Sequence, residues 1–273
     1  MNEQTEPMVR FFSLTVLPFV KEILAEELWM PPSRQLVADE ICEAVHDRAQ
    51  VLLDGESGAG KTCILRAIRM RLPQEGYRLT YCHNATLGRR DFYRQLCIAL
   101  GLSPCATAAA IFHALSTHIE SLSRDRIHPV FLLDEAHMLH QDTLDHLHIL
   151  LNYEWDSRAL LSLILVGLPE LRDRLELRKN RSLYSRIERR ISIEPLTAND
   201  THEYVRMRLR RAGCDRELFA DEALQLLHEA AGSSLRNVDR LATAALRMAA
   251  RHKKKRVERD LMANVVGANH AEH

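Results

Sequence analysis

The chain carries Gly55-Glu56-Ser57-Gly58-Ala59-Gly60-Lys61-Thr62 directly after the apolar run Val51-Leu52-Leu53. The spacing G-x-x-x-x-G-K-T is that of a phosphate-binding loop. Glycines let such a loop fold into a nest of N–H groups around phosphate oxygens. Lys61 adds a positive charge for the β- and γ-phosphates, and Thr62 offers a hydroxyl to Mg²⁺. All eight residues are therefore candidate ATP contacts, between a buried strand and a helix whose N-terminus faces the same anion.

A second apolar run, residues 128–133, ends in two carboxylates, Asp134 and Glu135. A continuously apolar run predicts a buried parallel strand, and ligands gather at the carboxyl ends of such strands. Asp134 is placed to complete a Mg²⁺ shell with Thr62, and Glu135 to orient and polarise an attacking water. The alternative is an ordinary strand followed by an acidic helix start. The phosphate loop upstream favours the hydrolytic interpretation.

The order of the expected elements predicts an α/β fold, a P-loop three-layer sandwich. Helical patterns, such as the one at about 33–48, alternate with five expected strands at 51–53, 78–82, 128–133, 160–166 and 191–193. This alternation predicts a five-stranded parallel sheet covered on both faces. Four helical patterns without strands then follow, at 199–212, 221–231, 235–252 and 257–266. We expect an N-terminal lead-in (1–33), a P-loop core (34–197) and a small all-helical lid domain (198–273).

Composition narrows the class of protein. The chain has 273 residues, 46% of them hydrophobic, and a formal net charge of zero, so bulk charge points to no particular partner. The six cysteines show no C-x-x-C spacing, which is typical of reduced thiols in a cytosolic protein. His137 and His140 are expected at solvated helix positions rather than in a zinc site. No apolar run approaches the ~18–20 residues that span a bilayer, and the acidic start is unlike a signal peptide, so a cytoplasmic protein with no membrane partner is expected.

A phosphate loop on the first strand, Asp-Glu on the third and a C-terminal helical domain resemble an AAA+ ATPase. The chain is similar in particular to the ExeA-like group, which overlaps the ATP-binding helper proteins of bacterial transposons (the TnsC, TniB and MuB kind). The resemblance covers about residues 12–266. Its matching stretches are 55–62, 131–137, 166–171, 183–187 and 232–236.

The resemblance implies two further nucleotide contacts. In such ATPases an arginine near the end of the core domain reaches the γ-phosphate of the neighbouring subunit, and Arg186 occupies that place. An arginine finger of this kind supplies a factor of ~10³–10⁵ in rate. Arg189 and Arg190 are close alternatives. Arg236 matches the lid arginine that touches nucleotide within its own subunit, although a surface salt bridge is the simpler alternative.

One residue departs from the group's pattern. Many ExeA-like proteins place a polar residue, often glutamine, after the glycine of the fourth strand, where this chain has Leu168. A leucine side chain cannot hydrogen-bond a γ-phosphate or a water. Either Glu170 or another neighbour supplies this sensing function, or hydrolysis is slow.

The resemblance also implies a DNA surface, because the transposition helpers bind double-stranded DNA inside an ATP-dependent helical filament. Arg89 and Arg90, after the second strand, would face the axis of such an assembly and contact phosphates. The alternative is a pair of solvated arginines. The lead-in aromatics Phe11, Phe12, Phe19 and Trp29 either pack the adenine base or form plain core.

Three functions are compatible with these residues. The first is an ATP-binding and ATP-hydrolysing regulator of transposition that binds double-stranded DNA, forms a homo-oligomeric ring or filament and engages a transposase. The alternative is an ExeA-like ATPase of a secretion or pilus assembly system. Those relatives carry a transmembrane segment and a peptidoglycan-binding domain beyond the lid, which the 273 residues lack, and this difference favours transposition. The third is a nucleotide-gated binding protein that scarcely hydrolyses ATP.

Overall fold

The computed structural model of the protein describes residues 6–20, 28–82, 87–103, 107–153 and 158–270. The chain divides into two compact units. The first, which we call the sheet unit, comprises residues 32–56 and 61–193. The second, the helical unit, comprises residues 1–31, 57–60 and 194–273.

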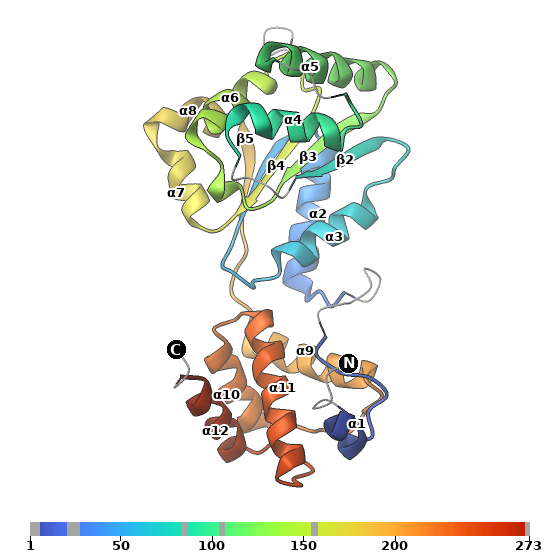
Figure 1. Ribbon diagram of the computed structural model, residues 1–273, viewed down its shortest axis with the longest axis vertical. Helices are drawn as coiled ribbons and strands as arrows, with labels where there is room; N and C mark the ends of the chain where they lie inside the picture. Colours follow the sequence, from blue (N-terminus) through green and yellow to red (C-terminus); the bar gives the residue numbers. More distant parts are fainter. Residues whose placement is uncertain (1–5, 21–27, 83–86, 104–106, 154–157, 271–273) are drawn as a thin grey trace. The chain divides into compact units, whose positions relative to one another are not determined.

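The sheet unit is built on five parallel strands in the order β2-β3-β4-β1-β5 (Figure 1). The strands are β1 (Gln50–Asp54), β2 (Tyr77–Cys82), β3 (His128–Leu133), β4 (Ser162–Gly167) and β5 (Ile187–Ser192). The predicted fold class, an α/β sandwich on a five-stranded parallel sheet, is confirmed. Every residue of β1, β3 and β4 is buried, as their apolar sequences require.

The edge strand β5 is longer than the predicted strand at 191–193 and starts at Ile187. Its middle residues Glu188, Arg189 and Arg190 are exposed. Charged side chains on an edge strand discourage pairing with another chain. Because these residues are polar, the first half of β5 could not be predicted from apolar runs in the sequence.

Two sets of helices flank the sheet. The described helices of this unit are α2 (Pro32–His46), α3 (Lys61–Arg71), α4 (Arg89–Ala99), α5 (Ala108–Arg124), α6 (Gln141–Leu150), α7 (Glu170–Glu176) and α8 (Arg181–Tyr184), with 3₁₀ turns η2 (Ala136–Met138) and η3 (Arg178–Asn180). The step from β1 to β2 runs across the sheet in one direction and the later steps run back, so right-handed connections place α3 on one face and α4 to α7 on the other. Accordingly α2 packs with α3, and α4 packs with α5 and α6 (Figure 1).

The helical unit contains α1 (Glu6–Phe12), α9 (Ala198–Arg211), α10 (Asp221–Ala231), α11 (Leu235–Arg251) and α12 (Arg259–His270). The N-terminal helix α1 packs on α11. Phe12 is buried in the core of this unit, and Phe11, Phe19 and Trp29 pack against that core. Phe12 is thus a core residue, and the other three aromatic residues are half-buried against the same core.

A buried arginine fixes the segment that follows α1. The Arg208 side chain donates from Nε to the Pro18 carbonyl (2.6 Å) and from Nη2 to the Val20 carbonyl (2.7 Å). Its Nη1 donates to the Tyr204 hydroxyl, which in turn donates to Asp239. A buried charge is tolerated only when its donors are used, so this network holds the N-terminal segment against α9.

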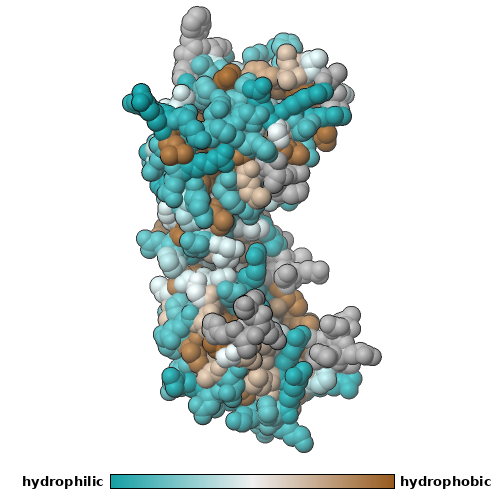
Figure 2. All heavy atoms as spheres, turned by 60° about the vertical axis from the view of Figure 1, so that its left-hand side comes forward, coloured by the Kyte–Doolittle hydropathy of each residue, from teal (hydrophilic) through white to brown (hydrophobic). Residues whose placement is uncertain are grey.

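The surface of the sheet unit is mostly hydrophilic on the face shown in Figure 2, with hydrophobic residues in small separate areas. Its most exposed large apolar side chains include Leu36, Met70 and Ile98. Across the described ranges of the chain, we find no helix that is long and apolar enough to cross a membrane.

Candidate functional site

The phosphate loop begins where β1 ends, with Gly55 buried and Glu56 and Ser57 exposed. Two glycines of the loop have a positive φ, 82° at Gly58 and 96° at Gly60. An L side chain rarely adopts such angles, which explains why glycine stands at both positions. The backbone path therefore explains the motif glycine at position 60 and the additional glycine at position 58.

Lys61, the first residue of α3, folds back over the loop. Its side-chain ammonium donates to the Gly55 carbonyl (2.6 Å) and the Glu56 carbonyl (3.0 Å), and the residue is only 8% exposed. A lysine charge removed from water needs such acceptors. The ammonium is thus held at the mouth of the loop, next to exposed Thr62.

Asp134 directly follows β3 and is buried. Its Oδ1 accepts the Glu135 amide (2.9 Å), and its Oδ2 accepts the hydroxyl of Tyr81, near the end of the neighbouring strand β2 (2.8 Å). Burial and this hydrogen bond raise the pKa of Tyr81, so the phenol stays protonated and donates. The Asp134 carboxylate and the Thr62 hydroxyl are oxygen donors of the kind Mg²⁺ takes alongside phosphates and water, so the residues fit that ion.

Glu135 has left-handed backbone angles, φ 53° and ψ 34°. A non-glycine residue in this region costs about 1–3 kcal/mol and persists where its surroundings fix it. The conformation ends β3 and starts η2. The Glu135 side chain is 51% exposed, and its Oε2 lies 3.5 Å from Nε2 of His137.

His137 was expected at a solvated helix position, and that expectation is wrong. It lies in η2 with its side chain only 18% exposed. The Leu168 amide, just after β4, lies within hydrogen-bonding distance of its Nδ1 (3.4 Å). His140 is exposed at the N-cap of α6. In the described part of the chain no group of three or more His, Cys, Asp or Glu side chains could hold a metal ion.

The position after β4 is occupied by the half-buried Leu168, and Glu170 is exposed at the start of α7. Among the described residues, no hydrogen bond or ion pair joins Glu170 to Asp134 or Glu135. Its proposed sensing role therefore stays a prediction.

A buried ion pair lies beneath the start of the loop. Arg172 of α7 donates from Nε (2.9 Å) and Nη2 (2.6 Å) to Oδ1 of Asp54, the last residue of β1. The Ser192 hydroxyl at the end of β5 donates to the other oxygen (2.9 Å). Both guanidinium N–H groups donate to the same carboxylate oxygen, and such charge-assisted hydrogen bonds are stronger than neutral ones, so the pair fixes α7 to the strand that carries the loop. The Ser192 hydrogen bond joins β5 to the same carboxylate.

The three candidate finger arginines lie close together in sequence but in different settings. Arg186 is half-buried after α8 and donates to the Ser182 carbonyl (2.9 Å). Arg190 lies over the Tyr184 ring, 4.1 Å from its centroid, whereas Arg189 is exposed on β5. In the helical unit, Arg236 is exposed at the second position of α11. The roles of these arginines toward nucleotide stay predictions.

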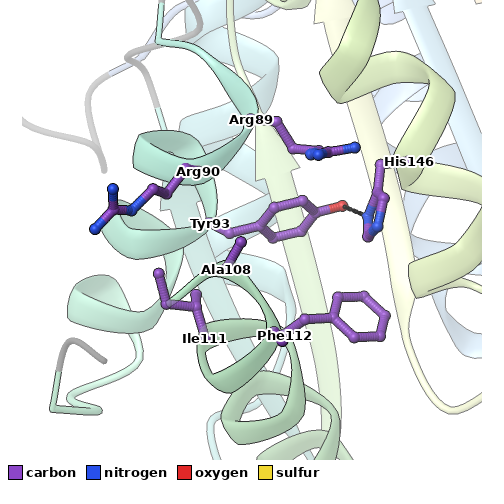
Figure 3. A pocket seen from close by; sticks show the side chains of 8 residues that line it. Arg89, Arg90, Tyr93, Ala108, Ile111, Phe112 and His146 are labelled. Atoms are coloured by element: carbon purple, nitrogen blue, oxygen red, sulfur yellow. Dashed lines mark hydrogen bonds between the residues drawn. The ribbon is translucent and has the colours of Figure 1, made fainter. Parts of the chain in front are cut away.

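Arg89 and Arg90 are exposed at the first turn of α4 and line a cavity of about 210 Å³ between α4, α5 and α6 (Figure 3). Tyr93, Phe112 and His146 form its aromatic wall. Arg89 points across Tyr93 toward His146, and Arg90 points away from it. Burial and then the Arg89 charge lower the pKa of His146, so the imidazole is neutral at pH 7. The preceding residues 84–86 lie outside the described part of the chain.

Three contacts around this site were not predicted: Tyr81 on Asp134, His137 beside Glu135, and Arg172 on Asp54. Tyr81 carried a signal, because a polar residue at the carboxyl end of a parallel strand lies at the ligand edge of the sheet. No sequence signal indicated the contact of Arg172 with Asp54 or the partial burial of His137, since both depend on how α7 and η2 pack.

Comparison with known proteins agrees with this geometry. Residues 43–175 match the AAA domain family. The chain is 32% identical over 240 residues to General secretion pathway protein A of Aeromonas hydrophila, a match that covers 87% of this chain and 44% of that protein. The chain thus spans less than half the length of that relative.

Solved structures share the fold at low identity. The ORC1 protein of Aeropyrum pernix in complex with DNA superposes with a TM-score of 0.63 at 19% identity, covering 89% of this chain and 66% of that one. The RuvB Holliday junction branch migration motor of Thermotoga maritima gives 0.58 at 17%, covering 93% and 73%. Residues 43–175 thus match the AAA domain family, and the phosphate loop on a parallel sheet gives the chain the fold of P-loop AAA+ ATPase structures.

Proposed function

We propose that this protein binds Mg·ATP at the carboxyl end of β1 and hydrolyses it to ADP and phosphate. The observation that carries the proposal is the buried Lys61 ammonium held over the loop by the Gly55 and Glu56 carbonyls. Phosphate oxygens are stronger acceptors for an ammonium than neutral carbonyls are. A triphosphate would therefore draw the lysine from the loop carbonyls to its own oxygens.

The chemistry follows from the acidic pair. Glu135 accepts a proton from a water whose oxygen attacks the γ-phosphorus, while the bond from that phosphorus to the β–γ bridging oxygen breaks and ADP leaves. Asp134 and Thr62 would hold Mg²⁺, which neutralises charge on the phosphates when bound. Arg186 would act on the site of a neighbouring copy and Arg236 on nucleotide of its own chain, which makes the proposed ATPase a homo-oligomer.

The direct test is isothermal calorimetry with Mg·ATP, followed by a phosphate-release assay on the same preparation. We expect one binding site per chain and slow turnover, since Leu168 offers no polar side chain. Absence of a binding heat would refute the nucleotide site. Binding without measurable phosphate release would leave the nucleotide-gated binding protein as the function.

We further propose duplex DNA as a partner, contacted at Arg89 and Arg90. Two observations support this proposal. Arg89 and Arg90 are both exposed on one helix turn, and they lie beside the cavity lined by His146, whose pKa is lowered. Contacts of arginine with phosphates are independent of sequence and weaken steeply with salt. The transposase partner and a cytoplasmic location belong to the same proposal.

The test compares the pair Arg89→Glu/Arg90→Glu with the matched pair Arg124→Glu/Arg126→Glu, which removes the same charge at the far end of α5. With ATP present, we expect only the first pair to lose duplex affinity, by 10-fold or more, and its ATP affinity to be unchanged. Equal losses in both pairs would reduce the effect to net charge. No loss in either would reject the surface.

A secretion or pilus-assembly ATPase is the second candidate, favoured by the 32% identity to General secretion pathway protein A. The DNA measurement separates the two functions. Failure of the wild-type protein to bind duplex DNA at low salt, together with normal ATP binding, would favour this second candidate.

A further inference from the structure

We propose that His137 is a positioning residue that orients Glu135 for its reaction with water. Its imidazole links the backbone amide of Leu168 to the Glu135 carboxylate. The inference rests on the proposed ATP hydrolysis and adds a residue to it.

The tautomer of His137 follows from its neighbours. Nδ1 faces the Leu168 amide at 3.4 Å, and an amide N–H can only donate, so this nitrogen accepts. In the neutral ring the proton is then on Nε2, the nitrogen that lies 3.5 Å from Glu135 Oε2. The His137 ring therefore accepts from the Leu168 amide after β4 and directs its own N–H at the Glu135 carboxylate. The second contact is long, as catalytic hydrogen bonds often are without substrate.

The position of the His137 backbone is fixed from two sides. Its carbonyl accepts from Arg174 Nη1 at 3.0 Å. A Cβ at Gly167 would lie 3.3 Å from the His137 amide nitrogen and 2.8 Å from Leu171 Cδ2, so η2 packs tightly against the end of β4. The backbone that carries the ring is therefore held in place next to the end of β4.

Glu135 needs such a neighbour, because its side chain is the more exposed of the two. Its side chain is 51% exposed and has several rotatable bonds, whereas its backbone is set in the left-handed region. A misplacement of about 1 Å at a reacting group can cost ~100-fold in rate. Leu168, whose side chain cannot sense the nucleotide, still contributes through its N–H, by way of His137.

The experiment measures ATP turnover and nucleotide affinity in His137→Ala, His137→Gln and the control His113→Ala, an exposed histidine on α5. We expect His137→Ala to lower kcat by 10-fold or more with KM and ATP affinity unchanged. His137→Gln should recover most of the rate, because an amide also offers one acceptor and one donor. Unchanged kcat in the alanine variant would overturn the proposal.

A double-mutant cycle with Glu135→Gln separates positioning from general structural damage. If His137 acts through Glu135, adding His137→Ala to Glu135→Gln should lower the residual rate by less than 2-fold. Fully additive losses would overturn the proposal. Should His137→Ala fail to fold, His137→Leu, which fills similar space but offers no acceptor or donor, takes its place in the cycle.

Hydrogen exchange gives a readout that does not depend on activity. The Leu168 amide should exchange faster in His137→Ala than in the wild type, by at least 5-fold, and at the wild-type rate in His113→Ala. No change would contradict the link. If the wild type released no phosphate, the proposed hydrolysis would fail. If Glu135→Gln did not slow phosphate release, the role of Glu135 as base would fail, whereas a null effect of His137 alone removes only this inference.

Discussion

The ends of β1 and β3 hold charged groups in two different ways. After β1, the loop uses its own backbone: glycines with positive φ shape it, and the carbonyls of Gly55 and Glu56 hold Lys61. After β3, the two carboxylates are held by side chains from elsewhere, Tyr81 of β2 and His137 of η2. A phosphate-binding loop can be specified by eight consecutive residues, here 55–62. The geometry of the acidic pair, Asp134 and Glu135, depends on contacts from the ends of β2, β3 and β4 together.

The largest effect on nucleotide binding is expected at the β1 end, from Lys61→Ala. Removing the ammonium takes away a charge-assisted contact to two phosphates, so ATP affinity should fall at least ~100-fold, or about 2.7 kcal/mol. Fluorescent-nucleotide titration measures it, with Lys254→Ala, an exposed lysine, as the control. Wild-type affinity would show that the loop alone grips the nucleotide.

At the β3 end, Glu135→Gln should leave ATP affinity within a few-fold of the wild type and lower turnover ~100-fold, because the amide cannot accept the proton of water. Rapid-quench measurement of phosphate formation checks it, with Glu120→Gln on the surface of α5 for comparison. Normal turnover in Glu135→Gln would mean that another residue is the general base, and the β3 end would then no longer differ in role from the β1 end.

Support of the β1 end by α7 can be removed with Arg172→Ala. Asp54 is 5% exposed, and Arg172 is 26% exposed. Leaving a buried carboxylate without its partner costs about 3 kcal/mol of unfolding free energy, at the lower end for buried pairs because the arginine is partly solvated. Urea unfolding measures the loss. The double variant with Asp54→Ala should recover part of it, and a loss below ~0.5 kcal/mol would show that Ser192 suffices.

The start of β3 gives a pH test of the same strand. Burial, and then the Arg48 charge, lower the pKa of His128 from 6.5 to about 4, and its Nε2 lies 2.9 Å from the Ser162 hydroxyl. Between those two pH values the unfolded chain binds the proton more readily, so stability falls as pH drops from 6.5 to 4 and is unaffected above. The contribution is about 2–3 kcal/mol.

The variant His128→Gln isolates this contribution, because it has no titrating ring. Its unfolding free energy should fall less steeply than that of the wild type over the same pH range. Parallel pH profiles would show that the His128 ring is not what makes the wild type acid-sensitive there.

The smallest effect is expected from Tyr81→Phe. The hydroxyl occupies Oδ2 of Asp134, so its loss should free that oxygen and lower the Mg²⁺ concentration for half-maximal turnover by 2- to 3-fold, about 0.5 kcal/mol. A Mg²⁺ titration at saturating ATP measures it. A higher Mg²⁺ requirement would mean that Tyr81 holds Asp134 in its working orientation.

The sequence alone predicted the sheet and the loop because both follow from local pattern. Residues 51–54 are apolar up to Asp54 and lead into glycines whose backbone angles exclude other residues. The predicted start of strand β5, at residue 191, was too late in the sequence. The charged residues Glu188 to Arg190 are compatible with a strand only because β5 lies at the edge of the sheet, and the strand order is not visible in the sequence.

The surroundings of the acidic pair could not be predicted in the same way. The contacts of Tyr81 with Asp134 and of Leu168 with His137 join residues 53 and 31 positions apart. A single sequence does not say which side chain of a neighbouring strand reaches across. The left-handed backbone angles at Glu135 could not be predicted from the sequence either, because glutamate has no preference for that conformation.

The grip of Arg208 on the carbonyls of Pro18 and Val20 spans 190 and 188 positions of the chain. During synthesis on the ribosome at roughly 5–20 residues per second, the segment after α1 therefore waits about 10–40 s for its anchor. Throughout that time Phe12 has no helical partner to cover it. The emerging N-terminus therefore exposes an apolar side chain until α9 and α11 have been made, and the sheet unit, which is encoded between the two halves of the helical unit, can finish folding first.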